Sequence, residues 1–270
     1  METTSLQILW NDPRLLVGVQ TAGVALARIV PVTMLVPLFG GRCAPRLIRL
    51  AIGGVLALAI TPALMAGLST PIRADLYILL LSRDLLIGLT LGFAGALVFH
   101  AIESAGALVD LSRGVTLAGA FTPGTPNRPA PTATFLGFLA VVLFFLIGGH
   151  QLLLAALADS FRHIQPLDLS AGVVNHATVT ESVIALSGAM FVLALQLAAP
   201  AIIVTLLVDV AAGVLGRLTP TTNAFFLGLT VKGTLAIAAV FVAVGTIAVA
   251  LRGQLADMLS AVKDLIREFV

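Results

Sequence analysis

The feature that most constrains this chain is a series of long apolar stretches with almost no charged residue. The first covers residues 15–38 and is interrupted by Arg28; the others cover residues 50–71, 85–102, 129–158, 182–208 and 233–251, with a shorter one at 218–231. A helix of about 20 apolar residues crosses the hydrocarbon core of a bilayer. The pattern therefore predicts about six long helices in a membrane.

Composition excludes the soluble classes of protein. Of the 270 residues, 59% are hydrophobic and 10% are charged, and the mean hydropathy is +1.09. Soluble domains carry about 25% charged residues, so this chain lacks the polar surface of a soluble enzyme. A net charge of +2 without a basic stripe excludes a nucleic-acid binder. The stretches lack the polar alternation of barrel strands, which leaves an all-α integral membrane protein.

Charges outside the apolar stretches predict the topology. Residues 1–10 carry Glu2 and no basic residue, so we expect no cleavable signal peptide. Arg42, Arg46 and Arg49 lie in one short connection, which the positive-inside rule places in the cytoplasm. Residues 159–181 then fall outside, the connection 209–217 inside and the C-terminus outside, unless a re-entrant break near Lys232 reverses the tail.

Small residues and an amphipathic segment predict helix contacts. Gly88, Gly92 and Gly95 recur at a spacing that lets another helix approach closely, within this chain or between subunits. Residues 252–270 place apolar side chains at helical spacing between charged ones, as in an amphipathic terminal helix. Such a helix lies on the bilayer or on a neighbour, or docks specifically.

The segment 114–131 cannot form one continuous helix, because it holds four prolines and three glycines. Non-helical backbone next to membrane helices is tolerated where protein buries it or where it lines a cavity. We therefore regard the segment as a candidate constriction, with an ordinary solvent loop as the alternative.

Motifs for catalysis, nucleotides and metals are missing from the sequence. The four histidines are scattered, no nucleophile elbow or phosphate loop occurs, and the single cysteine, Cys43, cannot form an intrachain disulfide. We expect no catalytic, cofactor or metal site. Glu103 and Asp110 share a helical face with Arg113 nearby; a local ion pair at a helix end is favoured over a proton relay. Asp209, Arg217 and Lys232 are costly in an apolar setting, and assembly is one use for them.

Three groups of residues carry a family resemblance. The N-terminal group is Leu26-Ala27-Arg28, Pro31, Pro37-Leu38-Phe39 and Thr61-Pro62. The middle group is Asp84-Leu85-Leu86-Ile87-Gly88, Gly92-Phe93, Ala105-Gly106-Ala107-Leu108-Val109-Asp110, Gly114, Gly148-Gly149-His150-Gln151-Leu152-Leu153 and Ser160-Phe161. The C-terminal group, which is the most specific, is Leu197-Ala198-Ala199-Pro200, Leu207-Val208-Asp209, Gly213, Gly216-Arg217-Leu218-Thr219-Pro220, Asn223-Ala224-Phe225-Phe226 and Gly228 to Lys232. With these residues the chain resembles the FliR/SpaR/YscT (SctT) membrane components of the type III protein export apparatus over nearly its whole length.

The resemblance implies a noncatalytic subunit of an export gate in the bacterial inner membrane, of a flagellum or an injectisome, through which unfolded proteins pass. FliP-like and FliQ-like subunits are the implied partners, with FlhB-like and FlhA-like proteins beside them. It also implies that residues 1–178 are FliP-like, that 179–251 form a FliQ-like hairpin, and that the apolar helices bury partly against partners in kinked, helically arranged hairpins. The rival class is a small secondary transporter or ion channel, whose paired broken helices are not visible in the sequence.

The resemblance also assigns roles to residues. In the family, the loop that corresponds to 114–131 is a plug in the pore, which here implies Gly114, Gly119, Phe121, Pro123 and Gly124, with Arg113 and Arg128 anchoring its ends. The residues expected to act in assembly are Arg28, Gly88, Gly92, Asp110, Asp209, Arg217, Pro220, Asn223, Phe225 and Lys232. The sequence departs from the family at Asp84, where Glu is usual, at Gln151 and at Thr122.

Overall fold

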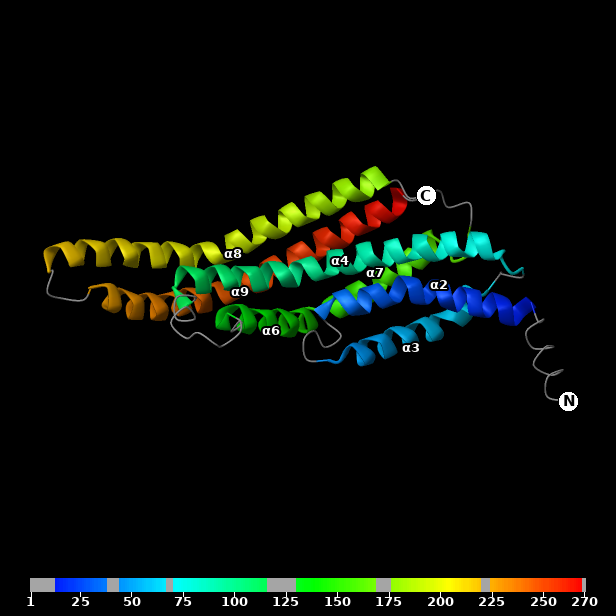
Figure 1. Ribbon diagram of the computed structural model, residues 1–270, viewed down its shortest axis with the longest axis horizontal. Coiled ribbons are helices and arrows are strands. Elements are labelled where there is room, and N and C mark those ends of the chain that lie inside the picture. Colours follow the sequence, from blue (N-terminus) through cyan, green and yellow to red (C-terminus); the bar gives the residue numbers. More distant parts are fainter. Residues whose placement is uncertain are drawn as a thin grey trace. The chain divides into compact units, whose positions relative to one another are not determined.

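The computed structural model describes residues 13–37, 44–66, 70–115, 130–168, 176–219 and 224–268, and every regular element within them is helical (Figure 1). The helices of these ranges are α2 (Pro13–Leu35), α3 (Arg46–Leu64), α4 (Ala74–Ser112), α6 (Pro131–Leu146), α7 (Gly149–His163), α8 (His176–Leu218) and α9 (Ala224–Glu268). The predicted all-α fold is confirmed for this part of the chain.

Five of these helices are long and apolar enough to cross a membrane. They are α2, α3, α4, the part of α8 from Thr180 to Leu218 and the part of α9 from Leu227 to Ile247. Helices α6 and α7 form a bent pair, which makes six candidate spans if the pair counts as one. The predicted number of long apolar helices is thus confirmed.

The ends of the helices follow from proline and glycine. Helices α2 and α6 begin at Pro13 and Pro131, since the fixed φ of proline suits a first turn and its missing N–H costs nothing there. Helix α4 ends at Ser112, and Gly114 follows with a φ of +77°. A glycine in this left-handed conformation is a common helix terminator. The candidate loop 114–131 is therefore bracketed by two helix ends.

The apolar stretch 129–158 does not form the one long helix that was predicted, because the helix breaks near Gly148. Gly148 has a φ of +74° and is the N-cap of α7, and the axes of α6 and α7 differ by 71°. An L side chain is disfavoured at this φ, whereas glycine adopts it freely. Apolar composition, on which the prediction rested, contains no information about such a bend.

Two expectations about the C-terminal region need correction. Helix α9 is continuous through Lys232, so the proposed break at that residue is wrong. Asp209 and Arg217 both lie within α8, so 209–217 is not a connection; the chain leaves α8 only after Leu218. The predicted amphipathic segment 252–270 continues α9 as far as Glu268, and most of its side chains lie outside the part of the chain that the structure describes.

The chain divides into two compact units that interleave in sequence. Unit 1 comprises Met1–Ala96, Gly148–Ala185 and Ala256–Val270, and unit 2 comprises Leu97–Ile147 and Leu186–Leu255. Helices α4, α8 and α9 contribute to both. The division expected from the resemblance, at residue 178, concerns likeness of sequence and remains a prediction.

Each unit has a core of its own. In unit 1, Val17 and Val24 of α2 pack with Leu80 of α4 and with Leu167, which follows α7. In unit 2, the rings of Phe99 and Phe144 lie 5.1 Å apart and join α4 to α6. Polar residues of α2, α4, α6 and α7 are also buried in these interiors: Arg28, Asp84, Asp110, Thr132 and Ser160.

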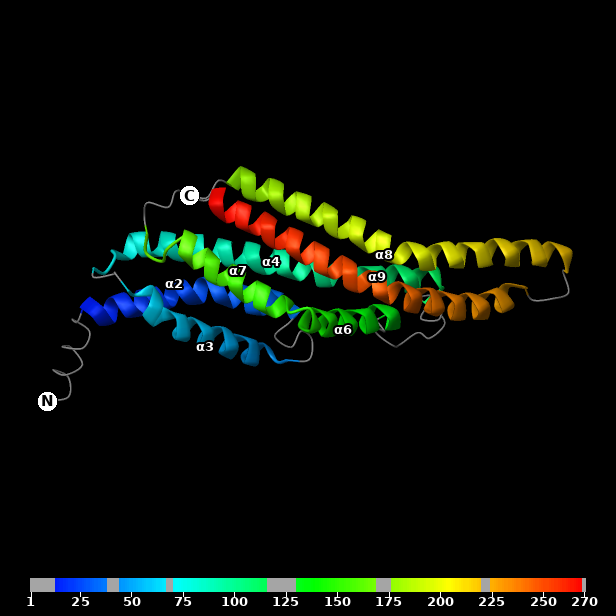
Figure 2. The ribbon, with the colours of Figure 1, turned by 180° about the vertical axis from the view of Figure 1, so that it is seen from behind.

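The α8 and α9 segments of unit 2 form a hairpin, seen side by side in both ribbon views (Figure 2). Much of its apolar surface is uncovered: Phe191, Leu207, Val210, Phe241 and Val242 are all more than half exposed. Exposed apolar area of this extent needs lipid tails or another protein against it.

Candidate functional site

The least expected polar residue of unit 1 is Arg28, which lies in the apolar helix α2 and is completely buried. A guanidinium group in an apolar interior is costly unless charges and hydrogen-bond acceptors surround it. The sequence shows only that Arg28 interrupts a hydrophobic stretch. The structure shows what compensates for it.

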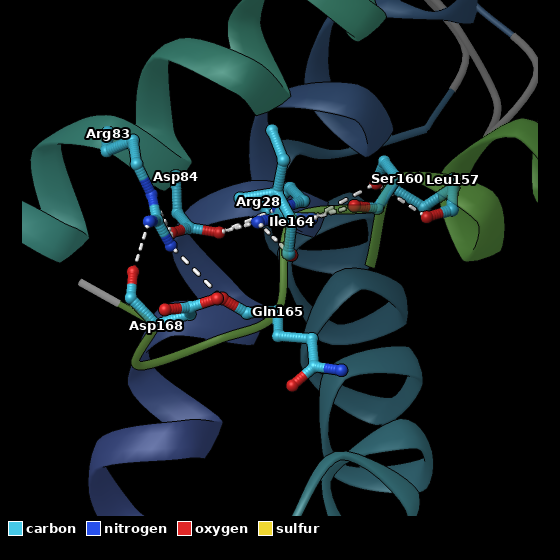
Figure 3. Close-up of polar contacts among 8 residues, drawn as sticks. All are labelled: Arg28, Arg83, Asp84, Leu157, Ser160, Ile164, Gln165 and Asp168. Carbon is cyan, nitrogen blue, oxygen red and sulfur yellow. Dashed lines mark hydrogen bonds and ion pairs between the residues drawn. The ribbon is translucent and has the colours of Figure 1, made fainter. Parts of the chain in front are cut away.

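Arg28 is held by α4 and by the end of α7 (Figure 3). Its Nε donates to Oδ1 of Asp84 at 2.7 Å, and Nη2 pairs with the same oxygen. Nη1 donates to the carbonyl oxygen of Ser160 at 2.8 Å, and Nη2 donates to that of Ile164 at 3.1 Å. The ring of Phe161 lies 4.3 Å from the guanidinium carbon. Ser160 lies in the last turn of α7 and Ile164 is its C-cap, so Arg28 both neutralises Asp84 and binds the C-terminal end of α7.

A second arginine completes this arrangement from α4. Arg83 donates to Oδ2 of Asp84 through Nη2 at 3.1 Å and to the carbonyl oxygens of Asp168 and Gln165 at 2.7 and 3.2 Å. Both oxygens of the buried Asp84 carboxylate are thus engaged by arginines. We call Arg28, Arg83, Asp84 and the backbone carbonyls of 160–168 that they bind the Arg28 network.

The turn held by Arg83 is strained. Leu167 has a φ of 64°, and the N–H of Asp168 donates to the carbonyl oxygen of Gln165. Pro166 before a residue of positive φ is typical of a type II turn, in which glycine usually takes the position of Leu167. The side chain of Leu167 is buried in the unit 1 core, and this burial offsets the backbone cost.

Glycines bring α2 close enough to α4 for the network to form. A Cβ on Gly88 would lie 2.3 Å from the carbonyl oxygen of Arg28, and one on Gly92 would lie 3.0 Å from that of Pro31. Gly88 is one helical turn after Asp84, so the close approach and the ion pair occur at the same level of α2. The sequence left open whether this glycine stripe packs inside the chain or between subunits, and the structure places it against α2 of the same chain.

A separate ion pair lies in the hairpin of unit 2. Nζ of Lys232 on α9 is 2.9 and 2.7 Å from the two carboxylate oxygens of Asp209 on α8. The side chain of Lys232 is 14% exposed and that of Asp209 is 55% exposed. The pair joins the two helices of the hairpin and leaves part of the carboxylate accessible.

The charged side chains of the Arg28 network are engaged with one another and with backbone carbonyls. No group of three or more His, Cys, Asp or Glu side chains in this part of the chain is arranged to hold a metal ion. The Asp84 carboxylate is enclosed by two arginines, so it has no open side for a substrate or a proton donor. The arrangement can fix helices against one another and hold the chain after α7.

Comparison with known proteins decides the family. A family model described as "Bacterial export proteins, family 1" matches residues 19–258. The chain belongs to this family. The export protein is similar to the flagellar biosynthetic protein FliR of Pectobacterium carotovorum subsp. carotovorum, with 34% identity over 212 residues, 78% of each chain.

Two further relatives come from different systems. FliR of Escherichia coli K12 is 27% identical over 247 residues, 90% of this chain and 91% of the relative. The Yop proteins translocation protein T of Yersinia pestis is 30% identical over 190 residues, 70% of this chain and 72% of the relative. The expected FliR/SpaR/YscT membership is confirmed.

Several residues expected to matter in this export protein are now placed. Gly114 terminates α4, and Arg217 is exposed in the last turn of α8, where a positive charge suits the helix dipole. Asp110 pairs with Arg113 at 3.2 Å, so the expected local ion pair at a helix end is confirmed. Phe225 is in the first turn of α9, but its side chain is outside the described part. The expected site residues wholly outside the described ranges are Gly119, Phe121, Pro123, Gly124, Pro220 and Asn223, together with the loop anchor Arg128.

Sequence reasoning missed the roles of Arg83, Ser160 and Ile164 in the export protein, and treated Asp84 only as part of a family motif. One signal was available: Arg28 in an apolar helix requires a buried acid, and Asp84 borders an apolar stretch of suitable length. The backbone acceptors leave no signal in the sequence, because any residue supplies a carbonyl.

Proposed function

We propose that this export protein is a noncatalytic core subunit of the type III protein export gate in the bacterial inner membrane. In this proposal it forms the secretion channel with FliP-like and FliQ-like subunits, next to FlhA-like and FlhB-like proteins, and unfolded proteins pass through that channel. The observation that carries the proposal is the family match over residues 19–258, together with relatives named for flagellar biosynthesis and for translocation of Yop proteins.

The geometry supports a structural subunit in two ways. The buried charges that the structure describes are used to join helices, as the Arg28 network shows. The α8–α9 hairpin exposes apolar side chains that need a covering partner or lipid. A subunit that works by holding a channel together requires both features.

The experiment is deletion of the gene in its host, followed by measurement of secreted flagellar or injectisome proteins. We expect secretion to be lost and to return when the intact gene is supplied. Normal secretion in the deletion strain would overturn the proposal, provided that no second copy of the gene is present.

We further propose that the segment 114–131 acts as a plug in the channel, with Phe121 contributing an apolar barrier to ions. This part rests on the proline and glycine content and on the family resemblance. Deleting residues 119–124, or making Phe121→Ala, should raise ion leak in cells that contain equal amounts of assembled complex. Unchanged leak in the deletion variant would remove the plug from the proposal.

A further inference from the structure

The end of α4 and the start of α6 are joined by one buried carboxylate. Asp110, in the last turns of α4, is completely buried. Its Oδ2 accepts hydrogen bonds from the backbone N–H groups of Thr132 at 2.8 Å and Ala133 at 3.2 Å. These groups belong to the first turn of α6, where N–H groups have no partner within the helix.

Helix α6 has no cap of its own. Its N-cap residue is Ala130, whose side chain offers no acceptor, and no side-chain hydrogen bond is made from that position. An aspartate that binds the first N–H groups of a helix satisfies them and is favoured by the helix dipole. Asp110 performs this role from a different helix, separated from α6 by the whole segment 114–130.

Arg113 fixes the other side of the carboxylate. Its Nη1 donates to Oδ1 of Asp110 at 3.2 Å and to Oγ1 of Thr132 at 2.8 Å. The Arg113 side chain is 13% exposed, so this ion pair is more shielded from water and salt than a surface pair. Arg113, which the sequence predicts to anchor one end of the loop, thus joins the end of α4 to Thr132 at the start of α6.

The approach of the two helices depends on Gly106. A Cβ at this position would lie 2.5 Å from Cα and 2.7 Å from N of Ala133. Gly106 lies one turn before Asp110 on the same face of α4. Gly106, which has no side chain, and the carboxylate of Asp110 therefore both allow the first turn of α6 to pack against α4.

We infer that Asp110 is a positioning residue that sets where the segment 114–130 leaves α4 and where it rejoins α6, with Arg113 and Gly106 supporting it. The sequence predicts a role for Asp110 in assembly, whereas this inference has it act inside the chain. This inference rests on the proposed function in one respect, namely that the segment 114–130 acts in the export channel. The geometry of its two ends stands without that proposal.

The test uses the assembled complex with a reporter cysteine, Thr125→Cys, in a Cys43→Ser background. The rate of maleimide labelling at 125 reports how well the segment is held, and ion leak reports its effect on the channel. Asp110→Ala should raise the labelling rate about tenfold, since charge-assisted hydrogen bonds are worth at least one such factor. Asp110→Asn should have an intermediate effect, because its amide oxygen can still cap α6 while the ion pair is lost.

The matched control is Ser112→Ala. Ser112 is on the same turn of α4, but its hydroxyl donates to Val109 of its own helix. We expect wild-type labelling and leak from this variant. A wild-type labelling rate in assembled Asp110→Ala complexes would overturn the inference.

A disulfide between α4 and α6 can replace the Asp110 contact without its charge, and so separates positioning from other roles of the carboxylate. It also provides a test if Asp110→Ala does not assemble. In Asp110→Cys/Ala133→Cys without the reporter cysteine, ion leak is the readout, because the two new thiols would themselves react with maleimide. Oxidation should lower the leak to the wild-type level, and reduction should raise it again. Failure of the closed tether to lower the leak would contradict positioning. If deleting 119–124 causes no leak, the plug proposal fails, but the labelling result still decides the role of Asp110.

Discussion

At the scale of single residues, the buried charges of this protein are explained by what they bind. Arg28 donates hydrogen bonds to carbonyl oxygens at the C-terminal end of α7, and Arg83 donates to a carbonyl oxygen of the turn that follows. The carboxylate of Asp84 pairs with both arginines. A glycine lies one turn from each buried aspartate of α4, Gly88 after Asp84 and Gly106 before Asp110. The same arrangement therefore occurs twice in α4. A glycine allows a neighbouring backbone to approach closely, and the aspartate one turn away binds a group of that neighbouring segment, the Arg28 guanidinium in one case and N–H groups of α6 in the other.

The first prediction concerns the pair Arg28 and Asp84. Asp84→Ala should destabilise the assembled complex by about 3–5 kcal/mol, because removing one partner leaves a buried charge uncompensated. The double variant Arg28→Met/Asp84→Ala should lose less than the sum of the single variants. Asp84→Glu should retain most of the stability, because it keeps the charge. Thermal inactivation of the complex in detergent measures these three variants and Arg28→Met, and strictly additive losses would show that the two residues do not act as a pair.

The second prediction concerns Gly88. Gly88→Ala should reduce the amount of folded protein strongly, since the added methyl group would meet the backbone of Arg28. Gly54→Ala in α3 is the matched control, because a Cβ there has no neighbouring atom within 4 Å. Alanine is favoured over glycine in a helix by about 1 kcal/mol, so the control should be neutral or stabilising. Equal yields of the two variants in membranes would contradict the close approach of α2 and α4.

At the scale of helices, much could be predicted from the sequence, and the exceptions have physical causes. Apolar length identifies α2, α3, α4, α8 and α9, because the cost of exposing backbone in lipid leaves few alternatives to a helix. Proline and glycine content identifies the interruption before α6. The bend at Gly148 and the strained turn at Leu167 could not be predicted, since both depend on backbone angles that tertiary contacts select.

The third prediction concerns the two helices of the hairpin. Asp209→Asn and Lys232→Met should each lower the yield of complex, because each leaves one member of the α8–α9 ion pair without its partner. The exchange Asp209→Lys/Lys232→Asp should recover part of the yield if the pair acts within the hairpin. Yield is measured by affinity purification and native electrophoresis.

A different result would favour another role for Asp209. If Asp209→Asn left the complex fully assembled, abolished secretion and changed its dependence on pH, a proton-linked function would replace the structural one.

At the scale of the whole molecule, the sequence predicts the class of protein better than the way its parts are used. Composition and the C-terminal motifs lead to the export protein family, which the match over residues 19–258 confirms. Contacts between distant segments are harder to predict: Arg28 meets a carbonyl 136 residues away, and Asp110 caps a helix across a loop. Such contacts depend on the three-dimensional arrangement of the helices. Their only sign in the sequence is an arginine or an aspartate within an apolar helix.

The composition of the native complex tests whether this protein is a subunit of an export gate. The tagged protein is extracted from its host membrane in mild detergent, and the copurified subunits are identified by mass spectrometry; in parallel, it is expressed alone. We expect a stable complex with FliP-like and FliQ-like subunits, and aggregation or degradation of the protein alone, because the apolar hairpin is left uncovered. A well-behaved monomer that recruits neither subunit would contradict it.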